Sequence, residues 1–194
     1  MLKVLLIALG ITLLIFIAVQ LFAMQGSKNI ESYNYNVVES YEGFEVRKYE
    51  ARLFTSIKLP NTTYKKGSSK GFSILAGYIF GGNDRKEKIS MTSPVSISLA
   101  DTMTMMFLVP KEFNKESLPT PDQSQIEFKE EPAKSVAVIT FGGWADDEKI
   151  SNQKQKLIEL LKKNDIKHTN KFYFLGYNPP FETFNRKNEV IVEL

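Results

Sequence analysis

The sequence predicts an α+β fold with an internal pseudo-two-fold repeat, preceded by an N-terminal transmembrane helix. Three observations lead to this prediction. A long uncharged run opens the chain. Two segments with helical periodicity follow, each preceded by a pair of strand-like segments. Each helix is then followed by a Pro-containing turn and a further strand. We expect two helices on one side of a curved antiparallel sheet, with a small-molecule crevice between helix and sheet.

The first element is the uncharged run Val4–Met24. As a helix it covers about 30 Å, the hydrocarbon thickness of a bilayer. A cleaved signal peptide is the alternative, but such peptides have apolar cores of about 7–15 residues and a small-residue cleavage site. The run is longer, and only a poor cleavage candidate lies around Ala23. An uncleaved single-pass membrane anchor is therefore expected.

The predicted domain boundaries follow from this reading. Residues 1–25 form the anchor, 26–36 a polar linker and 37–194 the folded domain. By the positive-inside rule, Lys3 favours a cytoplasmic N-terminus. The folded domain is then expected on the other side of the membrane, as a periplasmic or extracellular module. Lys28 lies on the other flank and opposes this orientation.

The first half of the domain begins with two strands within Phe44–Leu59, where apolar and polar residues alternate around a break at Glu50-Ala51. A helix is predicted over 69–80, and Gly81-Gly82 ends it. A hairpin follows, with its two strands over 95–99 and 102–110. The helix carries apolar residues at i, i+3, i+4 and i+7, which places one stripe against the core: Phe72, Leu75, Ala76 and Ile79.

The second half repeats the order. Ile126–Phe141 contains two strand-like pieces around Pro132, and Asp146–Asn164 reads as an amphipathic helix with an acidic N-cap. Lys171–Tyr177 and Asn188–Leu194 read as strands. Sequence identity between the halves is low, so the repeat is a match of patterns.

Composition limits the possible functions. The net charge is only +3 and Lys and Glu are interspersed, so no nucleic-acid partner is expected. The absence of cysteine excludes disulfides and thiolate chemistry. His168 is the single histidine, so a multi-histidine metal site is excluded, and its polar surroundings predict an exposed turn residue. The catalytic inventory is thin, and we expect no enzyme and no metal site.

Four motifs then point to a family. "GFSILAGYIFGGNDRKEKISMTSPVSIS", residues 71–98, resembles the central motif of the SOUL, or haem-binding protein, family. "FLGYNPPFETFNRKNEVIVEL", residues 174–194, resembles its C-terminal motif. "FEVRKYEA" and "VAVITFGGWA" resemble the starts of its two halves. The resemblance covers about Val37–Leu194 and implies a distorted antiparallel β-barrel with two helices. It also implies non-covalent binding of haem or another tetrapyrrole in an apolar crevice beside the first helix.

A tetrapyrrole is a flat apolar disc with carboxylates, so its site needs an apolar slot and one or two cations at the rim. The stripe on the first helix can supply one wall, and Met91, Met103 and Met105 can supply adaptable packing. Lys70 and Arg85 are the candidate cations, with Lys86 and Lys88 close to them in sequence. The alternative interpretation of the apolar stripe is ordinary core packing. The alternative interpretation of residues 84–88 is a solvated loop.

Three functions remain open at this point. The first is a membrane-anchored carrier or buffer of a tetrapyrrole. The second is a protein–protein interaction module that keeps the fold without the ligand, its partner unknown. The lack of a histidine in the first half favours this one, since histidine commonly ligates haem iron. The third is an enzyme that modifies tetrapyrroles. The segment 185–188 is expected to form a turn or a hydrogen-bonded latch.

Overall fold

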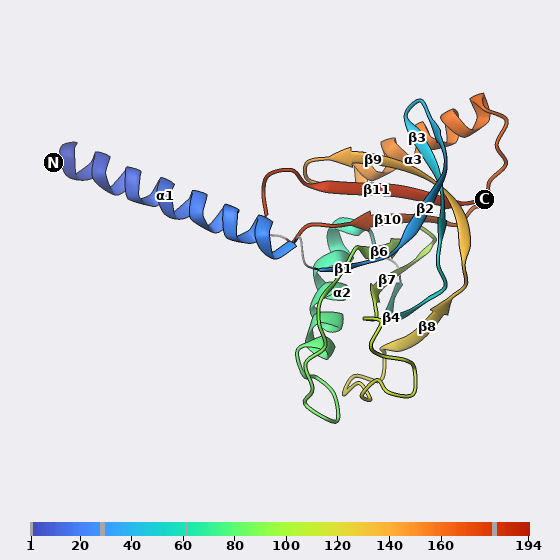
Figure 1. The fold of residues 1–194 in the computed structure, drawn as a ribbon, viewed down its shortest axis with the longest axis horizontal. Coiled ribbons are helices and arrows are strands. Elements are labelled where there is room, and N and C mark those ends of the chain that lie inside the picture. The colour runs from blue at the N-terminus through green and yellow to red at the C-terminus, as the bar shows by residue number, and fades with distance from the viewer. Residues whose placement is uncertain (1, 28–29, 61, 180–181) are drawn as a thin grey trace.

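The computed structural model describes residues 2–27, 30–60, 62–179 and 182–194. The fold is α+β, with a nine-stranded sheet that curls into a half-barrel (Figure 1). The helices are α1 (Leu2–Ser27), α2 (Tyr64–Ile79) and α3 (Asp147–Lys163). The strands are β1 (Glu31–Ser32), β2 (Tyr35–Tyr41), β3 (Phe44–Tyr49), β4 (Arg52–Pro60), β5 (Thr92–Ser93), β6 (Val95–Ser98), β7 (Thr102–Leu108), β8 (Glu127–Glu131), β9 (Lys134–Gly142), β10 (Phe172–Gly176) and β11 (Lys187–Glu193).

The strand order of the large sheet is β2-β3-β9-β11-β10-β6-β7-β4-β8, and every neighbouring pair in it is antiparallel. Read outward from the central β10–β6 pair, the order is β11, β9, β3 on one side and β7, β4, β8 on the other. Strands from the two sequence halves therefore occupy equivalent places. The central pair joins the halves, with Phe174 opposite Ile97.

The two faces of the sheet carry separate cores, because successive strand residues point to opposite faces. On one face, α2 and α3 cover a core that includes Met105, Ile139 and Val190. On the other face, a second core gathers around Tyr49 and Tyr173. The crevice expected between helix and sheet therefore belongs to the first face.

The end of α2 explains the Gly-Gly-Asn stretch. Gly81 has φ +104, a conformation that glycine adopts without strain. A Cβ on Gly82 would lie 2.7 Å from the main-chain oxygen of Gly77, so only glycine fits there. Asn83 is fully buried, and its amide nitrogen donates to the main-chain oxygens of Tyr78 and Glu87. These contacts fix the loop that leads to Met91.

The N-terminal helix requires a correction. α1 extends away from the sheet (Figure 1). Across the part of the chain that the structure describes, no helix is both long enough and apolar enough to cross a bilayer. The predicted single-pass membrane localisation was therefore wrong, and with it the expected membrane partner and exported domain lose their support. The prediction rested on the absence of charge from Val4–Met24, and that pattern alone does not establish a span.

Most sequence-predicted elements are present, with three differences. α2 begins at Tyr64, five residues before the predicted start, because polar and glycine residues conceal its first turns. β2 was not predicted, since its outward-facing residues break the alternation. β1 lies inside the segment predicted to be a linker and pairs in parallel with β5. The 95–99 and 102–110 hairpin is present as β6 and β7.

Candidate functional site

A cavity of about 440 Å³ lies between α2 and the β6–β10 pair. We call it the α2 cavity. This volume falls in the range of small-molecule sites, about 300–1,000 Å³. Its described lining is mostly apolar or aromatic and comes from both sequence halves. The lining residues are Ile30, Tyr64, Ser68, Ser69, Phe72, Met91, Thr92, Ser93, Val95, Ile97, Met105, Trp144, Ala145, Phe174, Gly176, Tyr177, Asn178, Pro179, Arg186 and Asn188.

The cavity exists because the first half of α2 carries small side chains. Gly67 and Gly71 let the helix approach the sheet closely, since an added Cβ on Gly71 would lie 2.7 Å from Leu59 Cδ1. Ser68 and Ser69 face the cavity with short side chains and leave it open. The helix is thus held near β4 and β7 on one side and leaves space on the other.

The structure places the sequence-predicted site residues in three environments. Phe72 and Met91 line the α2 cavity. Leu75, Ala76 and Ile79 are buried in the core and are not among the lining residues. The two predicted cations, Lys70 and Arg85, are both exposed outside the described lining.

Arg85 has other contacts, since its Nη1 donates to the main-chain oxygen of Ser117 at 3.0 Å. Of the further methionines, Met105 lines the cavity and Met103 does not. The roles assigned to these residues stay predictions.

Arg186 is the single charged residue of the described lining, and the sequence reading gave it no ligand role. Its Nη1 donates to the main-chain oxygens of Pro179 at 2.9 Å and Glu182 at 2.6 Å. Its Nη2 donates to the main-chain oxygen of Asn178 at 3.3 Å. The guanidinium carbon lies 4.0 Å from the ring centre of Trp144, a cation–π contact. The latch expected over 185–188 is therefore present, and Arg186 forms it.

The Arg186 guanidinium is poorly compensated. Its Nε is buried and has no hydrogen-bond partner. An orphaned buried donor costs about 1–3 kcal/mol. Burial lowers the pKa of Arg186, because the charged form loses solvation. The cavity therefore contains a partly desolvated cation whose donors are incompletely used.

Tyr177 connects the α2 cavity to the opposite face of the sheet. Its hydroxyl donates to Glu189 Oε2 at 2.6 Å, and Glu189 is fully buried. Arg47 Nη1 pairs with the same carboxylate at 3.0 Å. Burial raises the pKa of the Tyr177 phenol, and the charge of Glu189 raises it further. The phenol therefore stays protonated and acts as a donor.

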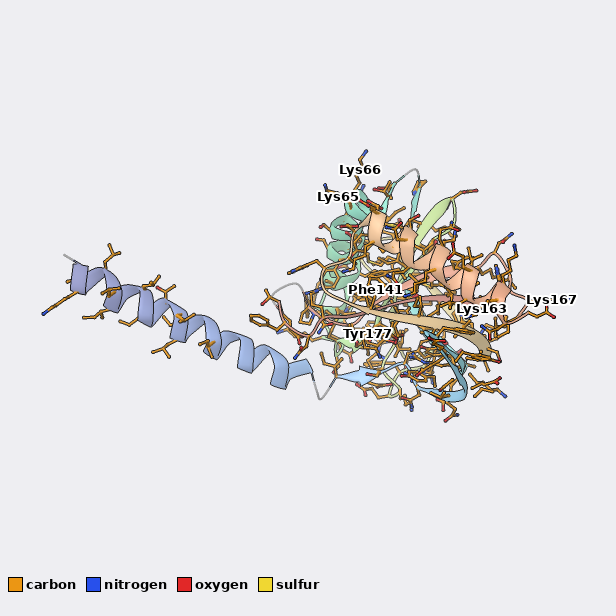
Figure 2. The ribbon with its side chains drawn as sticks, turned by 90° about the horizontal axis from the view of Figure 1, so that it is seen from above. Lys65, Lys66, Phe141, Lys163, Lys167 and Tyr177 are labelled. Atoms are coloured by element: carbon orange, nitrogen blue, oxygen red, sulfur yellow. The ribbon has the colours of Figure 1, made fainter. Side chains whose placement is uncertain are left out.

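The described residues contain no cluster of His, Asp or Glu suited to a metal ion. His168 follows α3 and is half-buried, not fully exposed as predicted; its Nδ1 lies 2.7 Å from the main-chain oxygen of Thr169. Lys167, its neighbour, lies at the end of the domain opposite Tyr177 (Figure 2). His168 itself is not among the described lining residues of the α2 cavity.

The comparison with protein families decides the family of the chain. A model described as the SOUL heme-binding protein family matches residues 30–193. The chain belongs to the SOUL family. The resemblance inferred from the four motifs is thereby confirmed.

Curated SOUL relatives include heme-binding protein 1 of Xenopus laevis, 26% identical over 76% of this chain and 81% of that protein. Heme-binding protein 2 of Homo sapiens is 28% identical over 76% of each chain.

Solved structures show the same fold at low sequence identity. The crystal structure of the EcmrR C-terminal domain has a TM-score of 0.62 at 12% identity, covering 82% of this chain and 96% of that one. SAV2435, solved bound to tetraphenylphosphonium, has a TM-score of 0.51 at 10% identity, covering 77% and 92%. At these identities the similarity concerns the fold alone.

Sequence reasoning missed part of the SOUL domain's cavity lining. Trp144 follows β9, and Tyr177, Asn178 and Arg186 belong to the β10–β11 connection. All four lie within the family motifs, so the motifs were the available signal. Their positions follow no helix or strand period, and only the pairing of β10 with β6 brings them opposite α2.

Proposed function

We propose that this SOUL-family chain binds haem or another tetrapyrrole non-covalently in the α2 cavity and acts as a carrier or buffer, without catalysing a reaction. The observation that carries the proposal is the cavity itself. It is apolar and aromatic on both walls, and its described lining contains one cation and no carboxylate. Such a lining suits a flat apolar ligand that bears negative charge. The names of the curated relatives, heme-binding proteins 1 and 2, agree with this ligand class.

The residues present fit a haem held mainly by packing. Phe72, Phe174 and Met91 offer apolar and polarizable surfaces to a macrocycle. The described lining holds no histidine, but Tyr64 and the two methionines, Met91 and Met105, are of types that ligate haem iron. When bound, haem supplies an iron centre and strong visible absorption, and the chain supplies shape, a dry surface and one cation.

The interaction-module alternative is not favoured. This alternative predicts that the chain's own side chains fill the space between α2 and the sheet. Phe72, which would have to close that gap, is half-buried and lines an open cavity instead.

The test uses the full chain and its single tryptophan. Because Trp144 lines the cavity, haem bound there is expected to quench its fluorescence and to shift the Soret band. Ser68→Phe fills the cavity from α2 and is expected to weaken haem binding by about tenfold or more, since the lost apolar contacts are worth over about 1.4 kcal/mol.

Ser73→Phe is the matched control, because Ser73 lies on the same helix but is exposed and outside the lining. It should leave haem binding unchanged. The proposal fails if the unmodified chain gives the spectrum of haem mixed with an unrelated protein. It also fails if both variants bind haem equally well.

A further inference from the structure

Arg186 has a donor without a partner. An arginine has five N–H donors, two on each terminal nitrogen and one on Nε. Nη1 donates to the main-chain oxygens of Pro179 and Glu182, and Nη2 donates to that of Asn178. Nε is buried and has no partner. The described contacts therefore leave part of the donor capacity of the guanidinium unused.

A carboxylate is a suitable partner for the Arg186 guanidinium. Hydrogen bonds from arginine to a carboxylate are charge-assisted and among the strongest in proteins. All three acceptors that Arg186 now has are main-chain oxygens, and the charge of Glu182 acts on the guanidinium and raises its pKa. An anionic ligand supplies a hydrogen-bonded counter-charge that the main-chain oxygens do not.

The surroundings fix the Arg186 guanidinium at the cavity wall. The three main-chain bonds fix the guanidinium against the 178–182 segment, and Trp144 stacks on its face at 4.0 Å. Asn188 Nδ2 donates to the main-chain oxygen of Gly143 at 2.7 Å, which holds the Trp144 segment to β11. Nε is buried, so a carboxylate from the cavity is expected to bind at Nη2, which has a single described acceptor.

We infer that Arg186, the single charged residue of the described α2 cavity lining, is the residue that recognises a carboxylate on the ligand, so the cavity selects flat aromatic acids over their neutral or cationic counterparts. This inference deepens the proposed function, since it names the polar group that the ligand must carry. It also assigns the anion contact to Arg186, in place of the sequence-predicted Lys70 and Arg85, which lie outside the described lining.

The first experiment changes only the ligand. The full chain is titrated with protoporphyrin IX and with its dimethyl ester, and with 1-pyrenebutyrate and its methyl ester, while Trp144 fluorescence is followed. Each acid is expected to bind about tenfold more tightly than its ester, because esterification removes the charge-assisted hydrogen bonding to Arg186. Tetraphenylphosphonium, a bulky aromatic cation, should bind more weakly than either acid.

The second experiment changes the protein. Arg186→Gln should abolish the preference for acid over ester while leaving ester binding in place. Arg186→Lys keeps the charge but loses the planar fork, and should retain only part of the preference. Arg85→Gln is the matched control, since it removes the same charge from an exposed arginine that also bonds a main-chain oxygen. Circular dichroism checks that each variant is folded.

The outcomes separate the two proposals. If the porphyrin binds but acid and ester bind equally, the inference about Arg186 fails and the proposed function survives. If only the pyrene acid binds, with a preference that Arg186→Gln removes, the inference survives and the tetrapyrrole proposal fails. If no acid binds, both fail. An acid preference that persists in Arg186→Gln but disappears in Arg85→Gln overturns the assignment to Arg186.

Discussion

The helices α2 and α3 cover equivalent parts of the sheet, but their buried faces carry different side chains. The second half of α3 buries Leu157 and Leu161 against β9 and β11, and no residue from 157 to 163 lines the α2 cavity. The first half of α3 borders a second, smaller cavity of about 250 Å³, to which Asp147, Ile150, Ser151 and Lys154 contribute. α2 buries Gly67 and Gly71 in its first half and large side chains only in its second half. The comparison shows how this fold makes a ligand site. Gly67 and Gly71 bring α2 close to the sheet, and the short side chains of Ser68 and Ser69 leave the α2 cavity open, whereas the second half of α3 shows an interface filled by leucines.

The largest expected effect is a loss of stability caused by a substitution on α3. Leu157 is fully buried, so Leu157→Ala removes packed methyl groups and leaves a void beside β9. We expect the free energy of unfolding to fall by about 3 kcal/mol. Ligand affinity should not change, because Leu157 lies outside both cavities. Urea unfolding measures the first quantity and Trp144 quenching by haem the second. A parallel loss of haem affinity would show that the two helices do not act independently.

The second prediction concerns α2, where a substitution should affect ligand affinity more than stability. Phe72 is half-buried, packs on Phe107 at 5.3 Å between ring centres and lines the α2 cavity. Phe72→Ala should lower the free energy of unfolding by only about 1 kcal/mol, because part of the ring faces the cavity. Haem affinity should fall about tenfold, since an aromatic contact is worth about 0.5–1.5 kcal/mol beyond its buried area.

Ile74→Ala is the control for Phe72→Ala, because Ile74 is half-buried on the same helix and does not line the cavity. It should leave haem affinity unchanged. Equal losses of affinity in the two variants would contradict the assignment of Phe72 to the ligand wall.

The same comparison shows what the sequence could predict. Alternation identified β3, β4 and the β6–β7 hairpin, and periodicity identified both helices of the domain. Periodicity reports which side of a helix is buried, but not whether sheet or ligand covers it. This is why the predicted stripe includes Phe72, at the cavity, together with Leu75 and Ile79, in the core.

Two further signals were harder to use. The Gly-Ser-Ser-Lys-Gly run of α2, residues 67–71, marks the helix half that leaves space, but in sequence it resembles a loop. Arg186 lies more than a hundred residues from α2, in an irregular connection. Its place at the cavity depends on the β10–β6 pairing between the two halves, which local patterns do not determine.

The smallest expected effect is a response to acid, which should arise far from the cavity. Lys134 Nζ pairs with Glu131 Oε2 at 2.7 Å and with Glu193 Oε1 at 3.0 Å. Burial alone would raise the pKa of both carboxyl groups, but hydrogen bonds from lysines, Lys134 among them, outweigh it and lower both below their usual value of 4.5. The folded chain therefore binds fewer protons at these two groups than the unfolded chain does.

That difference fixes the sign of the pH dependence. The stability that these groups contribute is present above pH 4.5, their unfolded pKa, and is lost as the pH falls through their lower folded pKa. Urea unfolding between neutral and acid pH should show this loss in the unmodified chain and a shallower one in Lys134→Met. Ser68→Phe should follow the unmodified chain, because the described cavity lining has no carboxylate and its arginine does not titrate in this range. An unchanged slope in Lys134→Met would show that the Lys134 ion pairs do not carry the acid response. A changed slope in Ser68→Phe would show that the α2 cavity contributes to it.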